Sequence, residues 1–249
     1  MHLTVQALVL RATPYKDTDM ILTLLSSSHG KLTVKARGLR RRNNPMVAAC
    51  QLLTYSEFSL FEYRGMYTVN EARTIEIFSN LRRDILKLSL GTYFAQVAEV
   101  VGQEDAPDTE LQSLLLNCLF AMSSLNIPNP RVKSVFELRC ACIAGYQPDL
   151  HGCYRCGDTM PDRFNIAEGR LECIPCRDPE SRGIRLPVTA GAVEAMRFIC
   201  FCDLKRIFSF QVGEESFDSL AQISESYLST QLERGFSSLD FYKSLLVQV

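Results

Sequence analysis

Two short cysteine pairs constrain the fold of this chain more than any other stretch. The first pair is Cys153 and Cys156, and the second is Cys173 and Cys176. A C-x2-C pair places two sulfur atoms on one tight turn. Two such pairs side by side supply four thiolates at the corners of a tetrahedron, the geometry that Zn²⁺ accepts. The spacing therefore predicts a four-cysteine zinc knuckle over residues 151–178.

The predicted zinc has a structural role. Four cysteine ligands leave no open coordination position, so the ion cannot activate a water molecule. No H-x-E sequence precedes the first pair, and we interpret His151 as a loop histidine, so the general acid/base of a zinc deaminase is missing. In a segment this short, metal binding must supply most of the folding free energy, on the order of 10 kcal/mol.

The alternatives for these cysteines are two disulfides or four unrelated buried thiols. The first residues of the chain lack the basic start and apolar core of a signal peptide, so we expect a reducing, cytoplasmic compartment in which thiols stay free. The symmetric recurrence of the pairs also favours zinc. Cys140/Cys142 and Cys200/Cys202 are spaced i, i+2 in helical segments, so their side chains diverge and are expected to be buried thiols.

The composition is that of a globular protein without a membrane span. The chain has 249 residues, of which 47% are hydrophobic and 22% charged, and no apolar run approaches the ~18 residues that a span needs. The net charge of −1 argues against a uniformly basic nucleic-acid binder. Within residues 1–80, however, Lys and Arg outnumber Asp and Glu, which indicates a local basic region.

The N-terminal part alternates polar and apolar residues with the period of β-strands. Turn residues separate the runs, including Ser26-Ser27-Ser28-His29-Gly30 and Arg64-Gly65. Five short strands in so few residues fit a small closed barrel of the OB type over residues 1–79, because closure removes exposed strand edges. The expected strands cover residues 4–11, 20–25, 31–37, 53–63 and 66–75.

A basic strand and loop of this barrel form the candidate DNA-binding site. The third strand has one basic face, and a loop with little apolar content follows it. We expect this loop to be mobile and its guanidinium groups to pair with backbone phosphates and displace counterions. The alternative is a solvated charge run that only keeps the loop soluble. The candidate residues are Lys31, Lys35, Arg37, Arg40, Arg41 and Arg42.

Beyond residue 80 the apolar period changes from two to 3.6. Helices are expected at about 85–101, 109–122, 132–144, 190–202 and 217–231, with a short one at the C-terminus. The predicted fold class is α+β multidomain, an N-terminal OB-fold barrel followed by an all-α domain that carries the inserted knuckle. The expected division is 1–79 for the barrel, 80–150 and 179–249 for the two parts of the helical domain, and 151–178 for the knuckle.

No catalytic constellation is present in the sequence. A Gly-rich phosphate loop, a nucleophile elbow, H-E-x-x-H and a clustered acid pair are all missing, so we expect no enzyme. Two non-catalytic functions remain. One is DNA binding through the basic loop, and the other is a zinc-knuckle adaptor without intrinsic DNA affinity, whose helices offer an apolar groove to a partner peptide.

The order of a basic barrel, helices, a knuckle and more helices resembles the RecO family of bacterial recombination mediators. The similarity covers essentially the whole chain, and the N-terminal text is its most specific part. That text comprises VLR at 9–11, YKDTD at 15–19, LTL at 22–24, HGK at 29–31 and KARG at 35–38.

The resemblance implies a DNA repair and recombination protein that acts at the bacterial nucleoid. It implies binding of single- and double-stranded DNA, annealing of complementary strands, and help in loading a recombinase onto strands coated by single-strand-binding protein, with a RecR-type partner. It also implies DNA contact for the six basic residues above and a zinc-ligand role for the four cysteines. The near-neutral charge departs from the more basic members, whose helical domains also present positive surface. Basic residues on the helices here are therefore candidates only, namely Arg131, Lys133, Arg139, Arg197, Lys205 and Arg206.

Overall fold

The computed structural model describes residues 2–125, 127–178, 180 and 183–247. The chain forms two compact units. The first comprises the N-terminal part, Met1–Asn126, together with the C-terminal segment Phe236–Val249, and the second comprises Ile127–Gly235. The predicted four-part division stays a prediction, and its boundary at residue 179 lies outside the described residues.

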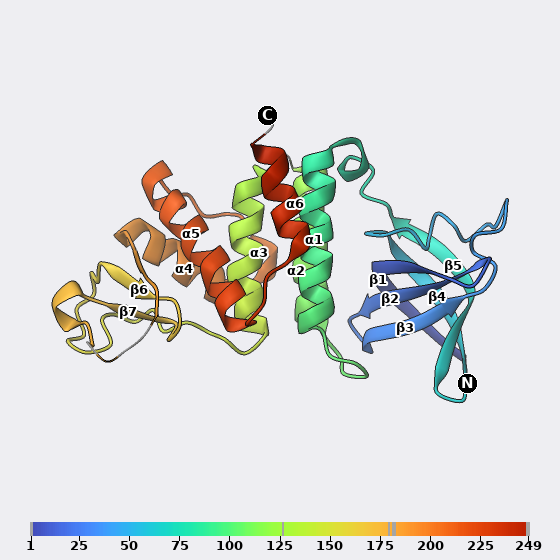
Figure 1. Ribbon diagram of the computed structural model, residues 1–249, viewed down its shortest axis with the longest axis horizontal. Helices are drawn as coiled ribbons and strands as arrows, with labels where there is room; N and C mark the ends of the chain where they lie inside the picture. Colours follow the sequence, from blue (N-terminus) through green and yellow to red (C-terminus); the bar gives the residue numbers. More distant parts are fainter. Residues whose placement is uncertain (1, 126, 179, 181–182, 248–249) are drawn as a thin grey trace. The chain divides into compact units, whose positions relative to one another are not determined.

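Five strands of the first unit close into a barrel in the order β1-β2-β3-β5-β4 (Figure 1). Each strand pairs with its neighbour in antiparallel fashion except β3 and β5, which are parallel. The long β1 closes the barrel because its first half pairs with β4 and its second half with β2. The predicted barrel is confirmed. Its strands are β1 (His2–Tyr15), β2 (Asp19–Ser26), β3 (Gly30–Ala36), β4 (Tyr55–Tyr63) and β5 (Met66–Glu76).

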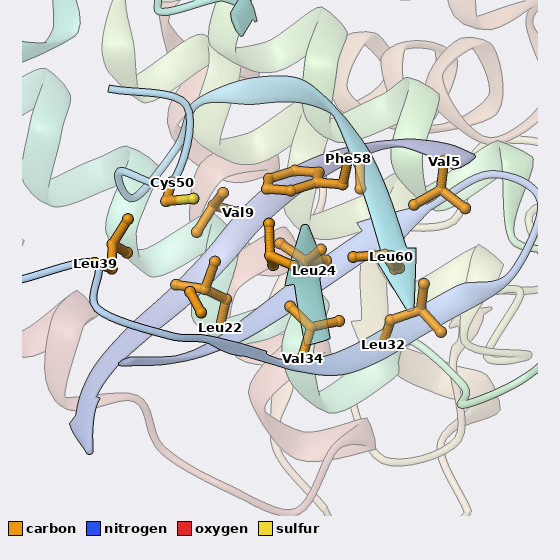
Figure 2. Packing of buried hydrophobic residues seen from close by; sticks show 13 residues of the cluster. Val5, Val9, Leu22, Leu24, Leu32, Val34, Leu39, Cys50, Phe58 and Leu60 are labelled. Atoms are coloured by element: carbon orange, nitrogen blue, oxygen red, sulfur yellow. The ribbon is translucent and has the colours of Figure 1, made fainter. Parts of the chain in front are cut away.

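The barrel encloses a hydrophobic core of its own. Alternate residues of the strands point inward, as the period-two pattern predicts. Val9, Leu22, Leu24, Phe58 and Leu60 are fully buried in this cluster (Figure 2). Burial of one such side chain stabilises the fold by about 1.5–3 kcal/mol. The barrel can therefore hold its shape while its outer face carries charge.

Three helices pack in the same unit as the barrel, namely α1 (Ile85–Val101), α2 (Thr109–Ser124) and α6 (Ser237–Leu246). Asp84 caps α1 by accepting hydrogen bonds from the backbone of its first turn, and Asp108 does the same for α2. The amide of Gln112 on α2 donates to the Leu25 carbonyl oxygen at 2.9 Å, which ties the helix to the barrel.

Gly30 marks a close approach between the barrel and the connection that follows α1. Its φ is +61°, and a Cβ at this position would lie 2.2 Å from the carbonyl oxygen of Ala106. A side chain cannot be accommodated there, so glycine is required both for its backbone conformation and for its small size.

The second unit contains α3 (Asn129–Ile143), α4 (Ala190–Phe201) and α5 (Glu214–Gln231). The six predicted helices are therefore present. Within the two units, α6 groups with α1, and the helices α3, α4 and α5 group with the knuckle. Sequence periodicity locates a helix but does not say which other helix its apolar face covers.

Buried charges join α3 to α5. Lys133 lies 2.9 Å from the carboxylate of Glu137 and 2.7 Å from that of Glu225. Burial alone would lower the pKa of Lys133, but the two carboxylates outweigh it and raise that pKa. The lysine therefore stays charged inside the unit, where its ion pair with Glu225 links α3 to α5.

Candidate nucleic-acid interface and metal centre

A small sheet that the sequence did not predict joins the knuckle to the segment that follows it. Its strands, in the order β7-β6-β8, are β6 (Arg163–Asn165), β7 (Arg170–Glu172) and β8 (Arg185–Pro187). The apolar residues Phe164 and Leu171 are fully buried, and Phe164 packs edge to face on Tyr227 of α5 at a centroid distance of 5.4 Å. Strands of three residues are too short to give a periodic signal.

The four predicted metal ligands come together. The Sγ atoms of Cys153, Cys156, Cys173 and Cys176 all lie within 4.8 Å of one another and could hold a metal ion. The Cys156 and Cys173 sulfurs are 3.9 Å apart. A tetrahedral site with Zn–S bonds of about 2.3 Å requires sulfurs about 3.8 Å apart, so the arrangement fits zinc.

The backbone of the knuckle supports negative charge on sulfur. Burial opposes ionisation of Cys153, but the N–H groups of Cys156, Arg155 and Cys173 outweigh it and lower the pKa of that thiol to about 6. Gly157 follows the first pair with φ +72°, the left-handed turn predicted for a knuckle.

Ionised sulfurs in this cluster repel one another. Burial raises the pKa of Cys173, and its interactions with the neighbouring thiols of Cys153 and Cys156 raise it further. A cation at the centre would remove this repulsion. The donor set therefore fits a divalent metal better than it fits four free thiols.

Contacts around the ligands orient the knuckle. Tyr154 donates a hydrogen bond from its hydroxyl to the Cys176 carbonyl oxygen at 3.1 Å and carries the guanidinium of Arg170 over its ring at 3.6 Å from the centroid. Cys173 donates its backbone N–H to the Cys153 sulfur at 3.4 Å. These contacts link the two cysteine pairs to each other and to Arg170.

The basic loop between β3 and β4 is a series of hydrogen-bonded turns. Its predicted mobility stays a prediction. Gly38 begins the loop, with its N–H donated to the Asp19 carboxylate at 2.8 Å. Arg40 then donates its backbone N–H to Thr18, and the Asn44 side chain donates to the Gly38 carbonyl oxygen. Local polar side chains thus supply partners for the loop backbone, which composition alone did not reveal.

The six predicted DNA-contact residues fall into two groups. Lys31 and Lys35 point outward on β3 as the alternation predicts, but both have partners within the first unit. The Lys31 ammonium donates to the Glu99 carbonyl oxygen at 3.0 Å, and Lys35 pairs with Asp19 at 3.0 Å beneath the ring of Tyr15. These two lysines have a structural role besides any contact with DNA.

The four arginines form the second group. Each has an exposed side chain, and none of them forms an ion pair with another described residue. Their charges are therefore available to an external anion. We call this group the loop arginines; it consists of Arg37, Arg40, Arg41 and Arg42.

Arg82 is a further basic residue beside this loop, and the sequence analysis missed it. It lies in the 3-10 turn η1 (Leu81–Arg83) and donates to the carbonyl oxygen of Leu52 at 2.7 Å and to the hydroxyl of Thr54 at 3.0 Å. The Arg82-Arg83 pair directly after the barrel is the only signal that could have indicated it.

Most basic residues of the second unit are engaged within that unit. Lys133 lies in the buried charge cluster, and Arg131, Arg139 and Arg197 donate to backbone carbonyl oxygens. Cys142 and Cys200, which we expected as separate buried thiols, have sulfurs 3.5 Å apart. Among the described residues, no helix combines the length and apolar character needed to cross a membrane.

Comparison with known proteins gives full-length matches. Residues 1–78 match the family model described as Recombination protein O N terminal, and residues 82–240 match the one described as Recombination protein O C terminal. A "DNA repair protein RecO" of Acetivibrio thermocellus is 32% identical over 246 residues, 98% of this chain and 97% of the relative. One of Alkaliphilus metalliredigens is 32% identical over 98% of this chain and 100% of the relative. These names describe a DNA repair protein and no catalytic activity, in agreement with the sequence interpretation.

Proposed function

Because this chain belongs to the RecO family of DNA repair proteins, we propose that it binds DNA through the loop arginines and acts as a recombination mediator. The observation that carries this proposal is the set of exposed guanidinium groups on one loop of the barrel, none of which is paired with a carboxylate among the described residues. Such groups bind phosphates and release the counterions that DNA otherwise holds.

Strand annealing follows from this binding without any bond chemistry. Neutralised phosphates repel each other less, so two single strands can approach. Weak, sequence-independent contacts let the strands shift past each other until base pairing takes over. We extend the proposal to double-stranded DNA, to a RecR-type partner, to strands coated by single-strand-binding protein onto which a recombinase is loaded, and to action at the bacterial nucleoid.

We propose that the knuckle holds one structural Zn²⁺ through its four cysteines. The ion supplies the cross-link that brings both cysteine pairs to one point, and its closed ligand set leaves it no part in bond chemistry. The closeness of the four sulfurs, which all lie within 4.8 Å of one another, supports zinc.

The test is binding of single-stranded DNA across a salt titration. With about five phosphates contacted, the affinity should fall with a log–log slope of roughly −4. Joint replacement Arg40→Ala, Arg41→Ala and Arg42→Ala should weaken binding to all sequences equally and flatten the slope by about 2. The matched control is Arg64→Ala, Arg73→Ala and Arg83→Ala, which removes the same charge from other parts of the first unit.

The outcomes distinguish DNA binding by the loop from a net-charge effect and from the adaptor function. A flattened slope in the loop variant but not in the control supports the loop as the DNA site. Equal effects in both would show that only net charge matters. An absence of wild-type binding even at low salt would favour the adaptor without intrinsic DNA affinity.

A further inference from the structure

A cavity on the barrel lies between the basic loop and Arg82. Its volume is about 540 Å³, within the ~300–1,000 Å³ range of small-molecule sites. Apolar residues that line it are Met20, Leu39 and Val47, and basic residues that line it are Arg40, Arg41 and Arg82. Leu39 and another lining residue, Cys50, lie at one end of the barrel core, so firmly packed side chains support the cavity (Figure 2). It therefore combines apolar walls with three cations.

Arg82 is oriented before any ligand arrives. One terminal nitrogen donates to both Leu52 and Thr54, which fixes the plane of the guanidinium. Of the five N–H groups of an arginine, three then remain for a ligand. Partial burial lowers the pKa of this guanidinium, and among the described residues no carboxylate pairs with it. An anion in the cavity would compensate for the lost hydration of the cation.

We propose that this cavity receives one unstacked nucleotide of single-stranded DNA, with the base against the apolar walls and its phosphate held by Arg40, Arg41 and Arg82. This inference rests on the proposed DNA binding and adds a site for a base to it. Arginine planes and apolar side chains stack on every base, so the site is tolerant of sequence. Arg37 and Arg42 are further exposed charges on the same loop, so the basic surface extends beyond what one phosphate requires, which favours a continuous strand over an acidic peptide as the occupant.

The first experiment compares an oligothymidylate with a strand of equal length in which every base is replaced by an abasic site. Both carry the same phosphates, so a purely electrostatic site binds them equally. Wild-type protein is expected to bind the intact strand roughly tenfold more tightly, in line with the effect of one stacked base. Arg82→Gln should remove this preference.

Two further variants show whether the preference depends on the guanidinium of Arg82 or only on its charge. Arg83→Gln removes the same charge from the same 3-10 turn, outside the cavity, and should keep the preference. Arg82→Lys keeps the charge but loses the planar fork, so it should bind both strands about equally while retaining the wild-type salt slope. Urea unfolding of each variant shows whether the barrel is intact.

A crosslinking measurement locates the base directly. 4-Thiothymidine placed in the oligonucleotide should crosslink, on irradiation, to peptides that contain residues 39–52, and Arg82→Gln should reduce the yield. An acidic peptide with one aromatic residue serves as competitor. If the peptide abolishes the crosslink to residues 39–52 while unlabelled single-stranded DNA does not reduce it, the occupant is a peptide and the proposal is overturned.

The outcomes distinguish this proposal from the broader one. If wild-type protein binds both strands equally, or if Arg82→Gln and Arg83→Gln behave alike, the nucleotide site is overturned while DNA binding by the loop stands. If wild-type protein binds neither strand, the proposed function fails and the nucleotide site fails with it.

Discussion

The barrel and the knuckle reach a defined structure by opposite routes. The barrel buries a continuous cluster of apolar side chains from all five strands. The segment 151–178 has few large buried side chains, among them Phe164, Ile166 and Leu171, and places four cysteine sulfurs together instead. A small apolar cluster seldom offsets the conformational entropy of folding, whereas a metal ion can.

The difference teaches which residues can be changed without unfolding the protein. In the barrel, the loop arginines lie outside the core, so the residues proposed to bind DNA are separable from those that hold the fold. In the knuckle, the four cysteines proposed to bind zinc are also the residues expected to hold the fold. Replacement of a loop arginine should therefore affect DNA binding alone, whereas replacement of a knuckle cysteine should unfold the knuckle.

The largest expected effect comes from the metal ligands. Cys173→Ser removes one thiolate from the cluster, and the metal binding proposed to stabilise the knuckle would contribute on the order of 10 kcal/mol. We expect loss of bound zinc and rapid tryptic cleavage within residues 151–178. DNA affinity through the barrel should persist. Zinc content by mass spectrometry and cleavage sites by peptide mapping measure the two effects.

Cys202→Ser is the matched control, because this half-buried cysteine lies outside the cluster. It should keep the zinc content and protease resistance of the wild type. Full resistance of Cys173→Ser without bound zinc would show that the small sheet folds unaided, and the contrast between the two regions would be lost.

A buried aromatic of the barrel gives the next largest effect. Phe58 on β4 is completely buried, so Phe58→Ala should lower the free energy of unfolding by about 3–5 kcal/mol. The zinc content should not change. Urea unfolding followed by circular dichroism, together with metal analysis, checks both statements.

Phe61→Ala tests the same strand at a partly exposed position, since that side chain is 37% exposed. Its cost should be clearly smaller than that of Phe58→Ala. Equal costs at the two positions would mean that core burial does not dominate barrel stability. Loss of zinc from Phe58→Ala would mean that the two regions are not independent.

The parts of the structure that local chemistry determines could be predicted from the sequence. Strands of the barrel follow from alternation with period two, and the helices follow from period 3.6 and their caps. The convergence of Cys153, Cys156, Cys173 and Cys176 follows from ligand spacing. In each case the signal lies within a short stretch of chain.

Features that depend on long-range packing could not be predicted. The carbonyl oxygen that Lys31 contacts belongs to Glu99, which lies 68 residues further along the chain. The same holds for the location of Arg82 beside the basic loop and for the grouping of α6 with the first unit. No local pattern encodes which distant backbone a charged side chain will meet.

The smallest expected effect concerns a charge that supports the basic loop of the barrel. Asp19 accepts a hydrogen bond from the Gly38 N–H and pairs with Lys35. The Gly38 backbone and then the Lys35 side chain hold the pKa of this carboxyl below its usual value. Because the pKa is lowered in the folded state, the stabilisation is present above the unfolded pKa of about 3.9 and is lost as the pH falls through the folded pKa.

Asp19→Asn should therefore be less stable than the wild type at pH 7, and the difference should shrink below about pH 4. Asparagine retains an acceptor for Gly38 but loses the pairing with Lys35, so DNA affinity should not fall. Urea unfolding over a pH series measures the difference, with the exposed Asp17→Asn as control. A constant difference at all pH values would assign the effect to the hydrogen bond instead of the charge. A large loss of DNA affinity would show that loop geometry and barrel charge are coupled, and the separation of binding residues from folding residues in the barrel would then fail.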